Sequence, residues 1–231
     1  MAKAYKITIA DEFKSDTFDY APYLLDRQRP IEGVPQLPES NIYKSRETVV
    51  HEDFTRYLIE HEMEENAWGR YNTSVFHSYI RKEAIHGYYS PNKQILLLSG
   101  KKRFVLDFCK KTESIEEIAL RLMQIDMGQL LSKLPHVKGV WFRFKNGLIR
   151  ASALMGANIE STADFQKYSS EGDISTLSFY YDHNNAAHPL MVVNDGTIVL
   201  YSNYPHIADE LNLVMRIKNE LLDDITQTVT I

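Results

Sequence analysis

Apolar and polar side chains alternate near the start of the chain, and this alternation predicts a β-strand. Tyr5, Ile7 and Ile9 are apolar, and the residues between them are polar, which is the two-residue period of a strand with one buried face. The period is lost between residues 11 and 45, where four of the eight prolines lie. Because proline fixes φ and has no backbone N–H to donate, we expect residues 1–45 to form one strand followed by an irregular segment.

Three segments carry apolar residues three or four positions apart, and each of them predicts a helix. They span residues 49–66, 114–127 and 206–222. The second begins with Ser114 and has Glu117 three positions later, the pairing with which a capping box satisfies free N–H groups at a helix start. We therefore expect an N-terminal helix, a central helix and a C-terminal helix.

Glycine-containing turns between apolar runs predict three β-hairpins. The turns are Gly100-Lys101, Asn146-Gly147 and Asp195-Gly196, all of the kind that two-residue hairpin loops prefer. Strands joined by such loops pair antiparallel. The predicted fold class is therefore α+β, with a mainly antiparallel sheet built from hairpins and with the N-terminal, central and C-terminal helices packed on it.

The composition is that of a globular protein, with 44% of the 231 residues hydrophobic and 25% charged. It excludes the disordered, collagenous and disulfide-rich classes. The length suits one large domain or two small ones. Since no internal repeat and no clean linker follows residue 45, we expect residues 46–231 to form one α+β domain, or two such units that meet near residues 132–137.

Three features argue against a membrane or secreted protein. The longest aliphatic run, Ile95 to Leu98, is far shorter than the roughly 20 apolar residues that a membrane helix needs. The N-terminal residues contain no apolar signal core. The one cysteine, Cys109, has no second cysteine with which to form a disulfide in the chain. We expect a soluble cytoplasmic protein that binds no membrane.

The net charge of −5 hides an uneven distribution of charged residues along the chain. Residues 81–150 hold 14 of the 26 Lys and Arg but only 6 of the 31 Asp and Glu, a local net charge of +8, whereas the remaining residues carry −13. Attraction of a phosphate depends on the local field rather than on the total charge. The basic segment therefore predicts a cationic surface, although a solvated polar face explains the same composition.

The hairpin around Asn146-Gly147 places basic residues on one face. A two-residue turn pairs Arg143 with Arg150 and Trp141 with Ser152. The predicted core face consists of Val140, Phe142, Phe144, Ile149, Ala151 and Ala153. Like charges directly opposite each other destabilise a sheet by about 0.2 to 1 kcal/mol, so we expect a partner that compensates for the two arginines.

Three partners can neutralise this face: carboxylates of the same chain, an acidic protein surface, or single-stranded nucleic acid. The last stacks its bases on aromatic rings while Arg and Lys follow its phosphates. The candidate ligand-binding residues are Trp141, Arg143, Lys145 and Arg150, joined by Lys101, Lys102, Arg103, Lys110 and Lys111 if the hairpins share a sheet.

The sequence contains none of the motifs of familiar nucleotide or hydrolase sites. There is no G-x-G pair, no phosphate-binding P-loop and no G-x-S-x-G nucleophile motif. Asp182, His183 and His188 come nearest to a metal-ligand set, and we interpret them as polar turn residues. We therefore predict no cofactor, no metal site and no assigned catalytic residue.

An Arg and a His separated by four to six residues form the basis of an alternative, enzymatic interpretation. The pairs are Arg46 with His51, Arg70 with His77 and Arg81 with His86. On a helix, such a pair suits a metal-independent ribonuclease, in which the cation binds the phosphate and the imidazole moves protons. The main prediction is a non-enzymatic binding or regulatory module whose ligand is single-stranded nucleic acid or an acidic protein surface. The alternative is a small metal-independent nuclease that uses Arg and His.

Overall fold

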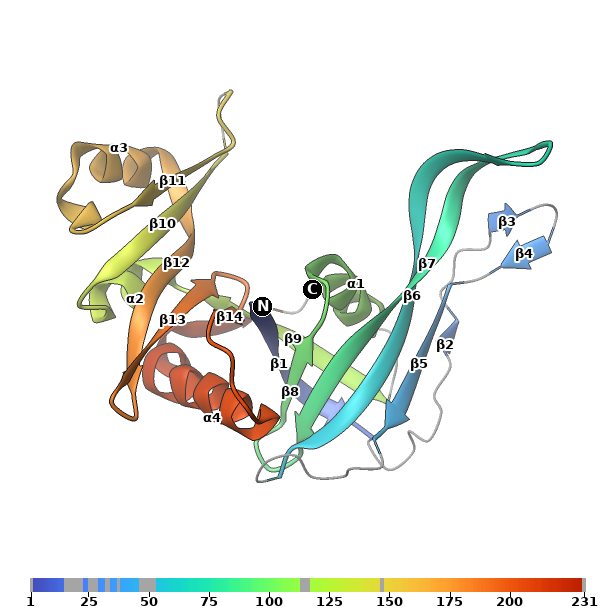
Figure 1. The fold of residues 1–231 in the computed structure, drawn as a ribbon, viewed down its shortest axis with the longest axis horizontal. Coiled ribbons are helices and arrows are strands. Elements are labelled where there is room, and N and C mark those ends of the chain that lie inside the picture. The colour runs from blue at the N-terminus through green and yellow to red at the C-terminus, as the bar shows by residue number, and fades with distance from the viewer. Residues whose placement is uncertain are drawn as a thin grey trace. The chain divides into compact units, whose positions relative to one another are not determined.

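A computed structural model shows a chain built mostly of antiparallel strands, with four α-helices among the residues it describes (Figure 1). The structure describes residues 2–14, 23–24, 29–31, 34–36, 38–45, 53–112, 117–145 and 148–229. The chain divides into two compact units. Unit 1 comprises Met1–Ile7 and Leu122–Thr230, and unit 2 comprises Thr8–Arg121.

Unit 1 contains a sheet whose strands follow the order β11, β10, β12, β13, β14 and the first part of β1. These strands are β11 (Ala151–Met155), β10 (Val137–Phe144), β12 (Gly172–His183), β13 (Ala186–Val193), β14 (Thr197–Leu200) and β1 (Lys3–Phe13). Each neighbouring pair is antiparallel. In the same unit β15 (Thr226–Val229) pairs antiparallel with the end of β9 (Ile118–Ile125).

The helices of unit 1 pack on one face of this sheet. They are α2 (Met127–Lys133), α3 (Ala163–Glu171) and α4 (Ile207–Ile217), the last followed by a π-helical turn (Lys218–Leu222) and a 3₁₀ turn (Asp223–Ile225). A further 3₁₀ turn, Ile159–Ser161, precedes α3. The fully or almost fully buried side chains of the sheet face include Val140, Phe142, Leu177, Phe179, Leu190, Val192, Ile198 and Leu200. The rings of α3 and the apolar side of α4 complete this core.

Unit 2 contains the strand order β1, β8, β7, β6, β5 and β2. The strands not yet given are β8 (Ile95–Ser99), β7 (Ser74–Ser90), β6 (Thr55–Tyr71), β5 (Glu39–Lys44) and β2 (Tyr23–Leu24). A separate two-stranded sheet consists of β3 (Arg29–Ile31) and β4 (Val34–Gln36). The helix of this unit, α1 (Lys102–Thr112), buries Phe104, Val105, Phe108 and Cys109.

The β6–β7 hairpin is much longer than the strands beside it. Its two strands pair from Thr55 and Tyr89 to Tyr71 and Ser74. By contrast, β5 pairs only with residues 57–61 of β6, and β8 pairs only with residues 86–90 of β7. Within the described part of the chain, residues 62–85 therefore form a two-stranded arm.

The predicted fold class is wrong, because two of its three helices are replaced by strands. The segment 49–66, expected to be the N-terminal helix, contains most of β6. In β6 the buried residues Tyr57, Ile59 and His61 follow a two-residue period. The apolar stripe of this segment suggested a helix. Backbone pairing with β5 on one side and β7 on the other makes the strand the more stable conformation.

The expected central helix at 114–127 is also largely a strand. It contains β9, in which Ile118 and Leu120 are buried at the two-residue spacing of a strand. Ser114, the first residue of the expected capping box, lies outside the described residues. The helical interpretation failed because a short apolar run fits either period until its pairing partners are known.

The hairpin predicted at Gly100-Lys101 is wrong as well, since the residues after this turn form α1. The buried residues of α1 recur three and four positions apart, as on one side of a helix. No helix in the described ranges has the length and apolar content that crossing a lipid bilayer requires. The predicted domain boundaries, after residue 45 and near 132–137, stay predictions.

Candidate binding surface

The middle of β10 gives unit 1 one buried face and one open face. Val140 and Phe142 are fully buried, Trp141 between them is half-buried, and Arg143 is exposed. Gly139 leaves room for the indole, because a Cβ there would lie 2.8 Å from Trp141 Cζ3 and 2.8 Å from Ser178 Oγ. The Trp141 ring therefore lies along the sheet, over Gly139, on the face opposite to Phe142.

The pairing of β10 with β11 differs by one residue from the predicted register. Arg143 faces Ala151 and Trp141 faces Ala153, whereas the two-residue turn predicted Arg150 and Ser152. A one-residue slip moves every side chain of a strand to the other face. Ala151 and Ala153 are accordingly exposed rather than in the core, and Ile149 is exposed too. The expected repulsion between directly opposed arginines does not arise.

The other strands of unit 1 extend the open face with two tyrosines. Tyr180 on β12 pairs with Pro189 on β13, and the Pro189 carbonyl accepts a hydrogen bond from the Tyr201 N–H at 3.2 Å. Tyr180 and Tyr201 are 54% and 48% exposed. The ammonium of Lys138 lies 5.7 Å from the centre of the Tyr180 ring. We call the surface formed by Lys138, Trp141, Arg143, Thr176, Ser178, Tyr180, Met191 and Tyr201 the open face.

Lys138, Tyr180 and Tyr201 are not among the site residues predicted from the sequence, although the sequence contains a signal for Tyr180. Along β12, polar Thr176 and Ser178 alternate with apolar residues that are buried in the structure. That alternation puts Tyr180 on the polar side of the strand. Only the pairing of β12 with β10 and β13, however, places it on the same surface as Trp141.

The chain's own carboxylates neutralise only part of the predicted basic face. Lys145 forms an ion pair with Asp173 at 2.9 Å. Asp173 also lies opposite Arg143 in the register of β10 and β12. Among the described residues, neither Arg143 nor Arg150 has a carboxylate within the 4.0 Å that defines an ion pair. Two of the three hairpin cations therefore remain available to a ligand.

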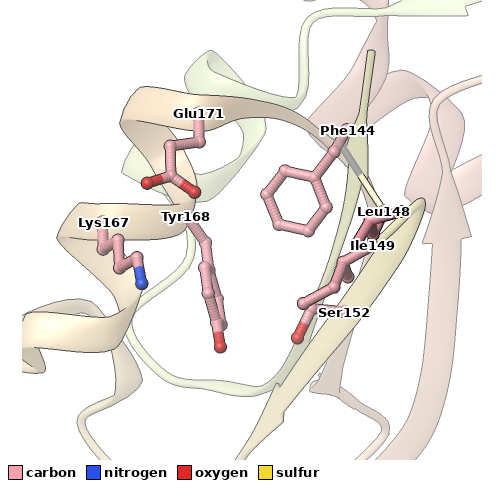
Figure 2. A pocket seen from close by; sticks show the side chains of 7 residues that line it. All are labelled: Phe144, Leu148, Ile149, Ser152, Lys167, Tyr168 and Glu171. Carbon is pink, nitrogen blue, oxygen red and sulfur yellow. The ribbon is translucent and has the colours of Figure 1, made fainter. Parts of the chain in front are cut away.

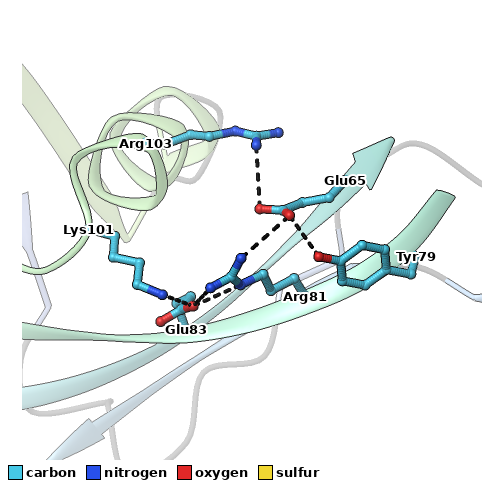
Figure 3. Close-up of polar contacts among 6 residues, drawn as sticks. All are labelled: Glu65, Tyr79, Arg81, Glu83, Lys101 and Arg103. Atoms are coloured by element: carbon cyan, nitrogen blue, oxygen red, sulfur yellow. Dashed lines mark hydrogen bonds and ion pairs between the residues drawn. The ribbon is translucent and has the colours of Figure 1, made fainter. Parts of the chain in front are cut away.

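The remaining predicted site residues belong to unit 2, where they lie at the start of α1 or within it rather than on a second hairpin. Lys101 bonds to Glu83, which also accepts from Arg81 Nε at 2.8 Å. Arg103 lies 3.4 Å from Glu65 (Figure 3). These contacts fix the start of α1 to the β6–β7 hairpin, and the bonds from Lys101 and Arg81 lower the pKa of Glu83. Lys102, Lys110 and Lys111 lie on α1.

Of the Arg and His pairs of the nuclease alternative that the structure describes, one is split between two faces of a strand, and the other lies on a hairpin rather than on a helix. Arg81 and His86 lie on β7 at an odd spacing, which puts their side chains on opposite faces of the strand. Arg70 Nε donates to the backbone oxygen of Asn72 at 2.7 Å. His77 lies on β7 rather than on a helix. Arg46 and His51 lie outside the described residues.

A Ser, a His and an Asp meet in unit 2, at positions far apart in the sequence. Ser40 Oγ contacts His61 Nδ1, and His61 Nε2 lies 2.9 Å from Asp107 Oδ2. In a hydrolase triad the serine bonds to Nε2 and the carboxylate to Nδ1, the reverse of this arrangement. Ser40 and His61 are also fully buried, so a substrate cannot reach the hydroxyl. The three residues join β5, β6 and α1.

The loop histidines considered as metal ligands make protein contacts instead. His188 Nδ1 lies 2.8 Å from the Tyr204 hydroxyl, and its Nε2 lies 3.3 Å from the His183 carbonyl oxygen. Within the described ranges, no three His, Cys, Asp or Glu side chains come together in a way that could hold a metal ion.

Comparisons of this chain with models of protein families and with curated proteins gave no match. The functional conclusion is therefore drawn from the geometry of the open face.

Proposed function

We propose that unit 1 binds single-stranded nucleic acid on its open face. The main support is that Trp141, Tyr180 and Tyr201 lie together on one face of an antiparallel sheet, which the described helices of unit 1 leave open, with Lys138 and Arg143 beside them. Aromatic rings on an open sheet offer stacking platforms to unpaired bases, and neighbouring cations contact phosphates. On the opposite face the rings of Phe165 and Tyr168 from α3 pack against Phe142.

The spacing of the rings suits a strand of several nucleotides. Tyr180 and Tyr201 are two strands apart across the sheet, which corresponds to about 10 Å. The Trp141 indole lies over Gly139, which pairs with Ser178, two residues before Tyr180 along β12, and this corresponds to about 7 Å along the strand. Each ring is therefore far enough from the next to receive its own base. The negative charge of the rest of the chain does not prevent such binding, because phosphates respond to the local field.

Fluorescence anisotropy with a labelled 12-nucleotide single strand tests this proposal. Trp141→Ala should weaken binding about 5- to 150-fold, the loss that follows when one stacked base loses its ring. Trp68→Ala is the matched control, because Trp68 is 79% exposed but lies in unit 2. It should leave the affinity unchanged.

The dependence of binding on salt gives a second readout. Each phosphate contact to a single strand adds about −0.7 to the slope of log affinity against log salt. Arg143→Glu should therefore flatten the slope by about 0.7, and Lys110→Glu in unit 2 should not. An absence of binding at micromolar protein and low salt, or equal binding by Trp141→Ala and the unaltered protein, would reject the proposal.

A further inference from the structure

The strand β11 is the last strand of the unit 1 sheet and has one free edge. Among the described strands, it pairs with β10 alone. The Phe144 N–H donates to the Arg150 carbonyl at 3.0 Å, and the Gly156 N–H donates to the Lys138 carbonyl at 3.1 Å. Because backbone groups of antiparallel strands point alternately toward and away from the partner, those of Ala151, Ala153 and Met155 point away from β10. No described residue pairs with them.

Within the described residues of unit 1, this edge lacks the features that usually prevent a strand from pairing with another chain. Natural edge strands carry lysine, proline, a bulge or a covering segment. The sequence of β11 is Ala-Ser-Ala-Leu-Met, with no charge and no proline. Large apolar side chains are instead exposed at both of its ends, Leu148 and Ile149 before it and Met155, which is 71% exposed, at its last position. The edge is therefore open to an added strand.

An apolar groove lies beside the same strand, between the β10–β11 hairpin and α3 (Figure 2). Its volume is about 630 Å³. It is lined by Phe144, Leu148, Ile149 and Ser152 from the hairpin and by Lys167, Tyr168 and Glu171 from α3. A strand added to β11 would place every second side chain on the face of the sheet that borders this groove. The groove thus offers a pocket for an apolar side chain of that strand.

The charge around the edge selects the chemistry of the partner. Arg150 directly precedes β11, and Lys167 lines the groove. Both are exposed, and neither has an ion pair within the described part of the chain. An acidic partner would satisfy these cations, whereas a second copy of β11 would bring like charges together.

We propose that β11 accepts an extended acidic peptide segment as an additional strand, with one of its apolar side chains in the groove beside α3. Strand addition of this kind derives its affinity from backbone hydrogen bonds and its specificity from pockets for alternate side chains. The proposal does not rest on nucleic-acid binding, since it uses the edge of the sheet and the groove rather than the rings of the open face.

A library of random 12-residue peptides displayed on phage, selected against the immobilised protein, tests the proposal. The expected sequences alternate apolar residues with Asp or Glu. The decisive variant is Ala153→Pro. It removes the N–H of residue 153, which points away from β10, and therefore breaks no hydrogen bond to β10. Proline is tolerated at an edge position whose N–H faces solvent. Ala153→Val is the matched control, because it keeps the N–H.

The selected peptides should bind Ala153→Pro at least tenfold more weakly than Ala153→Val, and Arg150→Glu should weaken them as well. In hydrogen exchange, the peptide should slow exchange of the Ala151, Ala153 and Met155 amides. Recovery of no peptides, recovery of basic peptides, or equal binding to both Ala153 variants would overturn the proposal. So would a concentration-dependent dimer that Ala153→Pro abolishes, because it would show that a second copy occupies the edge. Retained binding of the 12-nucleotide strand by Ala153→Pro would show that the two surfaces act separately.

Discussion

Phe142 and Arg143 are neighbours on β10 but lie on opposite faces of the sheet, so truncating each to alanine should affect stability very differently. Phe142 is fully buried, and its ring centre lies 5.7 Å from those of Phe165 and Tyr168. Phe142→Ala should lower the free energy of unfolding by about 3 to 5 kcal/mol. Arg143 is exposed, so Arg143→Ala should change it by less than about 0.5 kcal/mol.

Part of the loss at Phe142 comes from its contacts with α3. The two ring pairs are edge-to-face, and each is worth about 0.5 to 1.5 kcal/mol beyond the burial of area. No residue of α3 is fully buried, so this helix depends on Phe165 and Tyr168 for its attachment. Phe142→Ala should therefore also speed hydrogen exchange in residues 163–171.

Urea unfolding followed by tryptophan fluorescence measures the difference. The chain has two tryptophans, so a Trp68→Phe background leaves Trp141 as the reporter of unit 1. For a denaturant slope of about 2 kcal/mol per molar, Phe142→Ala should lower the midpoint by about 1.5 to 2.5 M. Phe142→Leu, which keeps part of the apolar volume, should lower it less. Equal effects of the two alanine variants, or a loss below about 1 kcal/mol for Phe142→Ala, would refute the assignment of the faces.

Two further predictions concern the dependence of stability on pH, measured from urea midpoints across a pH series. Burial raises the pKa of Asp107, but its bond to His61 and the charges of Lys111 and Lys110 outweigh this and lower it overall. Ionised Asp107 therefore stabilises the fold above the ordinary carboxyl pKa, and this contribution is lost as the pH falls through the pKa of Asp107 in the folded state. Asp107→Asn lacks the contribution, so its free energy of unfolding should fall less in acid. Burial and the bond to Glu220 raise the pKa of Tyr181 to about 12. The free energy of unfolding should therefore fall between about pH 10, where this tyrosine ionises in the unfolded state, and about pH 12. Tyr181→Phe should not show this loss, because phenylalanine does not ionise.

The sequence predicted the faces of β10 correctly but not those of β11. Val140 and Phe142 alternate with polar or amphipathic residues, and that period alone determines which side is buried. The faces of β11 depend on the length of the turn, and the Asn146-Gly147 pair predicts a turn of two residues. In the structure, β10 ends at Phe144 and β11 begins at Ala151. A shift of one residue then exchanged its two faces.

The wrong predictions of helix or strand in other segments have a different cause. The residues of α1 and β9 form short apolar runs whose local pattern fits both periods, and the outcome depends on tertiary pairing. By contrast, the hairpin predicted at Asp195-Gly196 is present, with Val193 opposite Thr197 and Gly196 at a φ of 80°. There the turn requires a conformation that glycine adopts readily. His61 and Asp107 are 46 residues apart, and no pattern in the sequence around either residue predicts such a contact.

The shifted register changes the reason for expecting a ligand near Trp141. Two directly opposed arginines would have required a compensating charge, but Arg143 lies between Ala151 on one side and Asp173 on the other. The sheet is therefore stable in this respect without a ligand. Support for binding comes instead from the side chains that the pairing of β12 and β13 adds to the open face. The same shift puts the small Ala151 and Ala153 on that face and Ser152 beside the groove. One register thus defines both proposed surfaces, and because Ala153 faces Trp141 across the β10–β11 pair, binding of the 12-nucleotide strand by Ala153→Pro is the measurement that separates them.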